Sequence, residues 1–310
     1  ILELAEELKK KVMAAAEREG TKAEVRVEGS VAKDTWLSGE PDIDIFMRVP
    51  PTIPREEFGK AMLKIARKAT QGFRQIERFA EHPYLESIVD DTRVNIVPCY
   101  RVERGEWMTA TDRTPFHTDY VKARLNEELC REIRLLKKFM KGVGVYGAEI
   151  RVGGFSGYLC ELLVLNYGSF VKVLESFADW QGRGVVDYEG FYEGKEKDAE
   201  RIFEEPLVIA DPVDEGRNVA AAVREERLNL FIVAAREFLK EPYLRFFYPP
   251  EIAALSTEEL ARTMKTRGST IVFVKFGKVD AVPDVLWGQL YKSQKAVRGL
   301  LERHAFNAVS

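Results

Sequence analysis

One short segment limits the choice of fold more than any other part of the chain. Residues 42–49 alternate between polar and apolar side chains, with Asp42 and Asp44 on one side and Ile43, Ile45 and Met47 on the other. Because successive side chains of a strand point to opposite faces, this pattern predicts a half-buried β-strand. Both aspartates are then expected on its polar face, aimed in the same direction.

The first 120 residues fit one mixed α/β unit around this strand. Helical spacing of apolar residues predicts helices at 1–20 and 55–73. Short apolar segments, one of them alternating with charged residues, predict further strands at 23–28 and 94–98. We therefore place the N-terminal domain at residues 1–120.

The rest of the chain divides into two further units. Residues 121–245 are expected to form a helical central domain, and the helix near 125–141 has one apolar and one basic face. Residues 246–310 predict a strand at 270–274 and then a helix at 285–302. That order indicates a third, small α/β unit whose remainder is absent. The expected fold class is α+β and multidomain.

Composition argues against several classes of protein. With 45% hydrophobic residues the chain can bury real cores, so disorder is not expected. A net charge of −3 argues weakly against nucleic-acid binding, but 31% charged residues leave room for a local basic face. Cys99, Cys130 and Cys160 are scattered, which predicts reduced thiols in the cytoplasm. No apolar run reaches the roughly 18 residues of a membrane span, and no signal peptide is recognised.

The Asp-x-Asp strand gains chemical meaning from the Gly29-Ser30 pair upstream. Two carboxylates on one strand face can hold hard cations such as Mg²⁺, which take oxygen ligands and keep waters and phosphates in their shell. A Gly-Ser bend lets the backbone approach phosphates and offers hydroxyl and amide donors. An isolated Asp-x-Asp is more often an exposed strand face. The combination predicts a nucleoside triphosphate site with Mg²⁺ as cofactor.

Residues 29–36 followed by 42–44 resemble the signature of the polymerase-β nucleotidyltransferase superfamily. Further segments resemble the archaeal, class I CCA-adding enzymes of that superfamily: 81–84, 96–100, 112–117, 146–149, 153–163, 211–213 and 217–221. The matching segments run in order over nearly the whole chain. The resemblance implies an N-terminal nucleotidyltransferase palm and, at residues 246–310, a partial C-terminal RNP-like domain whose tail is missing. It also implies addition of C, C and A to the 3′ acceptor end of tRNA from CTP and ATP.

The same resemblance implies roles for single residues. Asp42 and Asp44 would bind the metal ions, and Arg217 would read the incoming base together with the RNA backbone. The residues expected at the phosphates of the nucleotide are Gly29, Ser30, Lys33, His117, Lys137 and Tyr146. Compact Lys and His donors suit phosphate contacts, and the planar fork of Arg suits a base edge.

Four of these residues also have a plain structural interpretation. Lys137 could belong to the solvated basic face of its helix, and His117 could satisfy a loop. Tyr146, which lies between glycines, could be ordinary packing. Arg217 could be a surface residue of a polar loop.

The chain departs from the family pattern at a third catalytic position, where Asn95 replaces a carboxylate. Asn offers a neutral oxygen and cannot act as a base, so the catalytic metal is expected to be weakened while Asp42 and Asp44 keep the other. Asp90 and Asp91 are expected too far upstream to substitute. Three explanations stay open: a deliberate change that traps a substrate complex, a natural relative with low activity, or an Asn that suffices.

Several functions are therefore weighed. The first is the CCA-adding transferase, and the second is a weak or inactive relative that binds the tRNA acceptor stem. A poly(A)-polymerase-like enzyme and a small-molecule nucleotidyltransferase are further alternatives, and the basic helix at 131–141 argues against the last. No membrane partner is expected, and a homodimer is left open.

Overall fold

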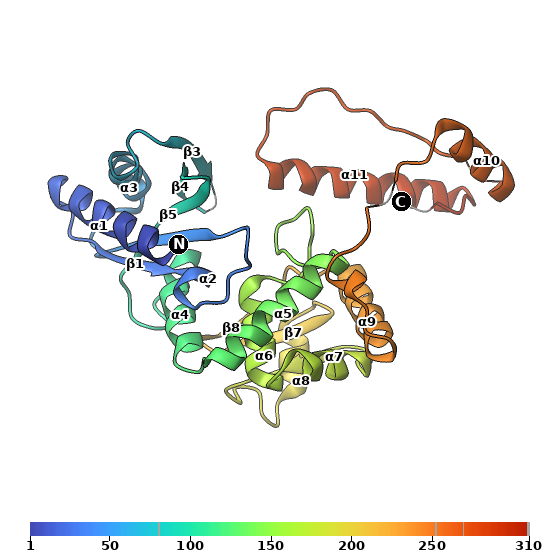
Figure 1. The fold of residues 1–310 in the computed structure, drawn as a ribbon, viewed down its shortest axis with the longest axis horizontal. Coiled ribbons are helices and arrows are strands. Elements are labelled where there is room, and N and C mark those ends of the chain that lie inside the picture. The colour runs from blue at the N-terminus through green and yellow to red at the C-terminus, as the bar shows by residue number, and fades with distance from the viewer. Residues whose placement is uncertain (80, 252, 269, 309–310) are drawn as a thin grey trace.

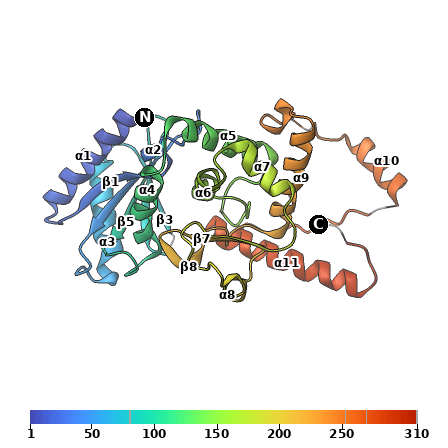
Figure 2. The ribbon, with the colours of Figure 1, turned by 90° about the horizontal axis from the view of Figure 1, so that it is seen from below.

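The computed structural model describes residues 1–79, 81–251, 253–268 and 270–308. An N-terminal α/β unit, a central unit and a C-terminal pair of helices follow one another (Figure 1). The N-terminal sheet and the central helices lie side by side in both views (Figure 2). The mixed-sheet palm and the helical central unit are thus confirmed.

A five-stranded sheet forms the body of the N-terminal unit. Its strands, in spatial order, are β1 (Glu24–Glu28), β2 (Asp42–Val49), β5 (Thr92–Tyr100), β4 (Pro83–Val89) and β3 (Arg74–Phe79). β2 and β5 are parallel, and the other neighbouring strands are antiparallel. The strands predicted at 42–49 and 94–98 are therefore direct neighbours, which places their polar residues in one row.

Helices α1 (Leu2–Arg18) and α3 (Arg55–Ala69) pack against each other and share one hydrophobic core with this sheet. The apolar side of β2 contributes its fully buried residues Ile43, Ile45 and Met47. α3 ends earlier than the predicted residue 73, because the chain turns at Gly72, whose φ of +94° lies in the left-handed region that favours glycine. One face of β2 is therefore buried in the core, and the opposite face, with Asp42 and Asp44, is available for a functional site.

The palm passes into the central unit through short helices. The four-residue helix α2 (Gly29–Ala32) follows β1, and the 3₁₀ helix η1 (Ala110–Arg113) leads into α4 (Thr114–Lys122). Arg26 of β1 forms an ion pair with Asp119 of α4 at 2.5 Å. This contact fixes α4 against the edge of the palm sheet.

The central unit is largely helical but also contains a small sheet. Its elements are α5 (Glu127–Val143), α6 (Gly157–Tyr167), α7 (Phe170–Ala178), β6 (Gly184–Val186), α8 (Glu196–Ile202), β7 (Leu207–Asp211), β8 (Asp214–Asn218), α9 (Glu225–Lys240) and η2 (Leu244–Phe246). Every residue of β7 is buried, as expected of the middle strand in the order β6-β7-β8. Helices α5, α6, α7 and α9 share the second large core with β7, whereas Ala199 of α8 lies in a separate small core.

The C-terminal unit consists of α10 (Thr257–Arg267) and α11 (Pro283–Arg303). The strand predicted at 270–274 is wrong for this structure, since residues 270–282 form no strand. An extended segment is stable as a strand only where a neighbour pairs with its N–H and C=O groups. α11 contacts the central unit through the Tyr291 hydroxyl, which donates to the Arg151 carbonyl at 2.8 Å.

Within the described residues, no single helix is both long and apolar enough to cross a membrane, although α6 and α7 reach that composition as a pair bent by 90°.

Candidate active site

The polar face of β2 and β5 carries the three residues expected to be catalytic. Asp44 lies directly opposite Asn95 in the parallel register, and Asp42 lies opposite Arg93. The Asn95 amide donates to Asp44 Oδ1 at 3.0 Å, and the Arg93 guanidinium pairs with both oxygens of Asp42. The strand period therefore brings two carboxylates and one neutral amide together.

Asp44 is the more enclosed of the two aspartates. Burial raises the pKa of its carboxyl to about 6, although the hydrogen bond from Asn95 acts in the opposite direction. Gly29 makes this enclosure possible, because its φ is +70° and a Cβ there would lie 2.2 Å from Asp44 Oδ2. Ser30 follows in the first turn of α2, and its carbonyl accepts the Thr35 N–H at 3.0 Å. The glycine–serine bend thus lies against the acidic strand.

No third acidic ligand joins them. Among the residues that the structure describes, no group of three or more His, Cys, Asp or Glu side chains is placed to hold a metal ion. Asp90 and Asp91 form the exposed two-residue turn between β4 and β5, with positive φ at both positions, so they lie at a hairpin tip as expected. Glu86 of β4 lies opposite Asn95, but its carboxylate pairs with Arg78 at 2.8 Å.

A cluster of buried charges joins the palm to the central unit. Lys33 Nζ lies 2.5 Å from Glu161 Oε2, and Lys137 Nζ lies 2.9 Å from Glu161 Oε1. Thr35 donates its hydroxyl to Glu161 Oε1 at 2.5 Å and accepts from Lys137 at 3.0 Å. We call Lys33, Thr35, Lys137 and Glu161 the interdomain ion cluster. It brings together two lysines that the sequence placed at the phosphates of one nucleotide.

The interdomain ion cluster corrects one interpretation of the sequence. Lys137 was also considered as part of a solvated helix face, but only 1% of its side chain is exposed. Burial by itself would raise the pKa of Glu161, and the ammonium groups of Lys137 and Lys33 outweigh it and lower that pKa to about 2. Glu161 is therefore ionised at neutral pH and lies between two ammonium groups.

An aromatic stack continues the site from Lys33. The Lys33 ammonium lies 5.7 Å from the centroid of the Tyr158 ring, and the His117 ring stacks on that ring at 4.2 Å. Burial lowers the pKa of His117, against the opposing effect of its hydrogen bond with Asp211. The His117 Nε2 lies 2.9 Å from Asp211 Oδ2.

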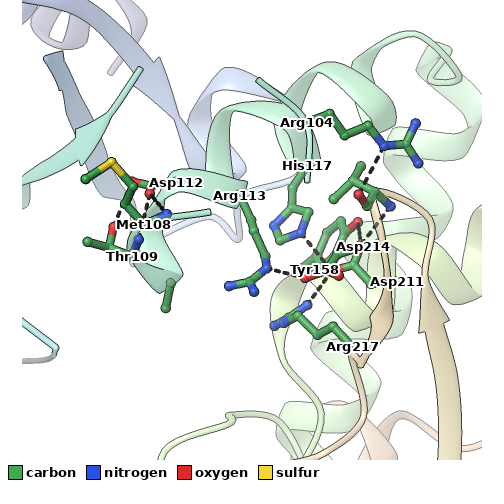
Figure 3. Close-up of polar contacts among 12 residues, drawn as sticks. Arg104, Met108, Thr109, Asp112, Arg113, His117, Tyr158, Asp211, Asp214 and Arg217 are labelled. Atoms are coloured by element: carbon green, nitrogen blue, oxygen red, sulfur yellow. Dashed lines mark hydrogen bonds and ion pairs between the residues drawn. The ribbon is translucent and has the colours of Figure 1, made fainter. Parts of the chain in front are cut away.

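Asp211, at the end of β7, accepts hydrogen bonds from several side chains of the site (Figure 3). Arg217 donates to Asp211 Oδ2 at 2.6 Å, and the Tyr158 hydroxyl donates to Oδ1 at 3.2 Å. The Asp211 side chain is fully buried, whereas 38% of the Arg217 side chain is exposed. Arg217 lies in strand β8, so its placement in a polar loop is wrong. Its guanidinium is anchored on one side and open on the other.

The β7–β8 hairpin is also tied to the palm side of the molecule. Arg113 pairs with Asp214 at 2.5 Å, and Arg104 donates to the Pro212 and Val213 carbonyls at 2.6 and 3.1 Å (Figure 3). These contacts fix the hairpin that carries Arg217 relative to the helix that carries His117.

Tyr146 joins the site from the loop after α5. A Cβ on Gly157 would lie 3.1 Å from the Tyr146 hydroxyl and 3.6 Å from Lys137 Nζ, so both groups border the same glycine. Tyr146 also bridges Phe155 through the backbone. The Tyr146 hydroxyl is thus close to the interdomain ion cluster. Ordinary packing of the tyrosine would not require this proximity.

The sequence interpretation assigned no role to three residues that organise this site: Tyr158, Glu161 and Asp211. One signal for Glu161 was available, because it is the one charged residue in the otherwise apolar segment 157–167. A charge on a buried helix needs a partner, so its position indicated a polar contact. Tyr158 and Asp211 carried no comparable signal.

Comparison with known proteins connects each unit to a described family. Residues 5–121 match the nucleotidyltransferase domain, residues 131–248 the second domain of tRNA nucleotidyltransferase, and residues 267–310 the C-terminal domain of the CCA-adding enzyme. The CCA-adding enzyme of Methanothermobacter thermautotrophicus is 40% identical over 312 residues, which cover 100% of this chain and 67% of that protein. The chain belongs to the CCA-adding enzyme family.

Other relatives agree with this membership. The CCA-adding enzyme of Methanosarcina barkeri is 42% identical over 309 residues, which cover 98% of this chain and 66% of that enzyme. The chain therefore spans about two thirds of the length of the curated relatives that it matches. A structure of the Cid1 poly(U) polymerase has a TM-score of 0.63 at 15% identity, covering 79% of this chain and 92% of that one. At that identity the likeness shows a shared nucleotidyltransferase fold.

Proposed function

We propose that the chain adds C, C and A to the 3′ end of tRNA from CTP and ATP without a template. The observation that carries the proposal is a continuous set of contacts between the palm and the central unit. It runs from Lys137 through Glu161 and Lys33 to Tyr158 and His117. These contacts bring together the groups that a member of this family needs for one nucleotide.

The reaction consists of a single displacement at phosphorus. The 3′-hydroxyl oxygen of the RNA attacks the α-phosphorus and its proton passes to water. The bond from that phosphorus to the oxygen that bridges the α- and β-phosphates breaks, and pyrophosphate leaves. Asp42 and Asp44 would hold Mg²⁺, which when bound neutralises charge on the phosphates. The donor set suits this ion, since both side chains offer hard oxygens and the Asn95 carbonyl oxygen is not used in its bond to Asp44. Binding of the ion at Asp42 would have to displace the Arg93 guanidinium, which pairs with both Asp42 oxygens.

We assign the phosphates of the nucleotide to the groups around the interdomain ion cluster. Ser30, beside Gly29, offers a hydroxyl at the acidic strand, and Tyr146 offers another beside Lys137. Lys33 and His117 complete the set of donors. A loop contact for His117 and ordinary packing for Tyr146 would explain why these side chains are buried. They would not explain why both lie close to the two lysines.

Arg217 is proposed to read the incoming base. One of its nitrogens is held by Asp211, and the open side of the guanidinium leaves further donors for a base edge and an RNA phosphate. We also propose domain boundaries at 1–120, 121–245 and 246–310 and a cytoplasmic location, both from membership of the family. A homodimer stays a prediction.

A second function is favoured by one specific observation. Asn95 stands where the family has a carboxylate, and its amide already donates to Asp44. A relative that binds the tRNA acceptor stem without turnover would show this arrangement. The same change would also fit an enzyme that is merely slow.

The test uses labelled CTP and ATP with tRNA transcripts that end before CCA. The proposal predicts incorporation of C and A and rejection of UTP and GTP. Long homopolymeric A tails or equal use of UTP would indicate a poly(A)-polymerase-like enzyme. Tight binding of the transcript without incorporation, also in Asn95→Asp, would establish the binding-only alternative.

A further inference from the structure

We propose that Glu161 is a positioning residue for nucleotide binding: anchored by Lys137, whose three N–H groups bind Glu161 and Thr35, it holds the Lys33 ammonium group where a triphosphate can engage it. The inference rests on the proposed function and extends it to a residue with no assigned role. Glu161 need not touch the nucleotide itself. It acts through Lys33.

The geometry supports this role because the two lysines come from different units. Lys33 follows α2 of the palm, and Lys137 lies on α5 of the central unit. Each ammonium binds a different oxygen of the same carboxylate, at 2.5 and 2.9 Å. Two like charges repel strongly in a dry interior, so without the carboxylate between them they would separate.

The charge balance of the interdomain ion cluster suits an anionic ligand. Two ammonium groups and one carboxylate sum to +2 − 1 = +1, in a cluster whose charged side chains are at most 6% exposed. Buried ion clusters built for stability alone are expected to be neutral, because an uncompensated charge is costly there. This surplus positive charge is not isolated, because the Lys33 ammonium also interacts with the Asp44 carboxyl. It therefore lies where the interdomain ion cluster borders the acidic strand, which is where the phosphates are proposed to bind.

The Glu161 carboxylate is itself held rigidly. Thr35 donates to Oε1 at 2.5 Å, and the same oxygen accepts from Lys137. Oε2 accepts from Lys33. Because both oxygens are hydrogen-bonded, the carboxylate is held in one orientation, and this fixes the positions of the two ammonium groups bound to it.

Two other roles predict different behaviour. If Glu161 only repelled the nucleotide, its neutralisation would strengthen triphosphate binding. If it only joined the two units, its neutralisation would lower stability and leave the preference for a triphosphate over a monophosphate unchanged. A positioning role predicts a weaker preference despite the added positive charge.

The experiment measures the dissociation constants of ATP and AMP with Mg²⁺ by isothermal titration calorimetry. It compares the 310-residue chain with the variants Glu161→Gln, Glu161→Asp and Asp112→Asn. Asp112 is the matched control, since it is fully buried and accepts N–H groups of Tyr100 and Met108 but touches neither lysine.

We expect the ratio of the AMP to the ATP dissociation constant to fall about tenfold or more in Glu161→Gln, the scale of losing one or two charge-assisted hydrogen bonds. Glu161→Asp keeps the charge on a shorter side chain and should give an intermediate ratio. Asp112→Asn should keep the parental ratio even where it loses stability.

An unchanged or larger ratio in Glu161→Gln would overturn the inference and leave the proposed function intact. Should Glu161→Gln fail to fold, Glu161→Asp decides, because a ratio equal to that of the parent would overturn the inference equally. A parent chain that binds ATP no better than AMP would overturn the proposed function and this inference with it.

Discussion

The strand pair that carries Asp42 and Asp44 and the interdomain ion cluster are built in opposite ways. The aspartates are partly exposed neighbours on one strand, and their partners Arg93 and Asn95 lie directly across the parallel register. The lysines of the interdomain ion cluster are buried and lie 137 − 33 = 104 positions apart in the sequence. Local backbone geometry places the first set, whereas packing between two units places the second.

This difference predicts how each region responds to change. Alterations at the strand pair should affect chemistry and leave folding nearly intact, because its side chains keep contact with water. Alterations in the interdomain ion cluster should affect folding and nucleotide binding together, since each charge there depends on the others.

The largest effect is expected from Lys137→Ala. Removing this ammonium leaves Glu161 with a single cation in a buried site, and we expect the free energy of unfolding to fall by about 3 kcal/mol. Urea unfolding followed by circular dichroism measures the change. Arg131→Ala, on the exposed face of the same helix, is the control and should cost about 0.5 kcal/mol or less. Equal losses in the two variants would contradict the buried coupling.

Asn95→Asp tests the strand pair that carries Asp42 and Asp44. A third carboxylate beside Asp44 would supply a metal ligand and a base, and we expect the rate of nucleotide incorporation to rise about 100-fold. The free energy of unfolding in Mg²⁺ should change little. Asp90→Asn, at the hairpin tip, is the control and should leave the rate unchanged. A rate that does not rise would show that the third carboxylate is not limiting.

Acid should weaken the interdomain ion cluster. The pKa of Glu161 is lowered from 4.5 to about 2, so the stability that this carboxylate contributes is present above pH 4.5 and is lost as the pH falls toward 2. The difference in the free energy of unfolding between the parent and Glu161→Gln should therefore shrink in that window, by roughly 3 kcal/mol. Chemical denaturation at several pH values measures both curves. Parallel curves throughout would count against the shifted carboxylate.

The smallest effect concerns the close approach of the backbone to Asp44. Gly29→Ala and Gly39→Ala both place alanine at a positive φ, but only Gly29 has a side chain in the way, with Asp44 Oδ2 2.2 Å from the added carbon. We expect Gly29→Ala to cost about 1 kcal/mol more than Gly39→Ala in the free energy of unfolding. It should also slow incorporation, while Gly39→Ala should not. Equal costs would mean that the carboxylate moves aside freely.

Much of the palm could be predicted from the sequence because its signals are local. The alternation over residues 42–49 gave the strand, its buried face and the common direction of Asp42 and Asp44. The amphipathic pattern of α5 likewise matched a helix that begins after Asn126 and ends at Gly144. Periodicity of two or of 3.6 residues is set by the backbone, so it is visible without any tertiary information.

The central part of the site could not be predicted in the same way. Lys137 lies within a run of basic residues, and nothing in its sequence context shows that this lysine is buried while its neighbour Lys138 is partly exposed. The three-stranded sheet with Arg217 was also missed, because its strands are short and β8 carries no apolar side chain. Such positions depend on which partner the fold supplies from a distant segment, as Glu161 does for Lys33.

The most direct test of the account is a crystal structure of the chain with CTP and Mn²⁺, which has an anomalous signal that locates the ion. The account predicts the metal on Asp42 and Asp44 and the triphosphate within hydrogen-bonding distance of Lys33, Lys137 or Tyr146, beside the Gly29–Ser30 bend. A nucleotide bound elsewhere, or a triphosphate that contacts none of these residues, would contradict it.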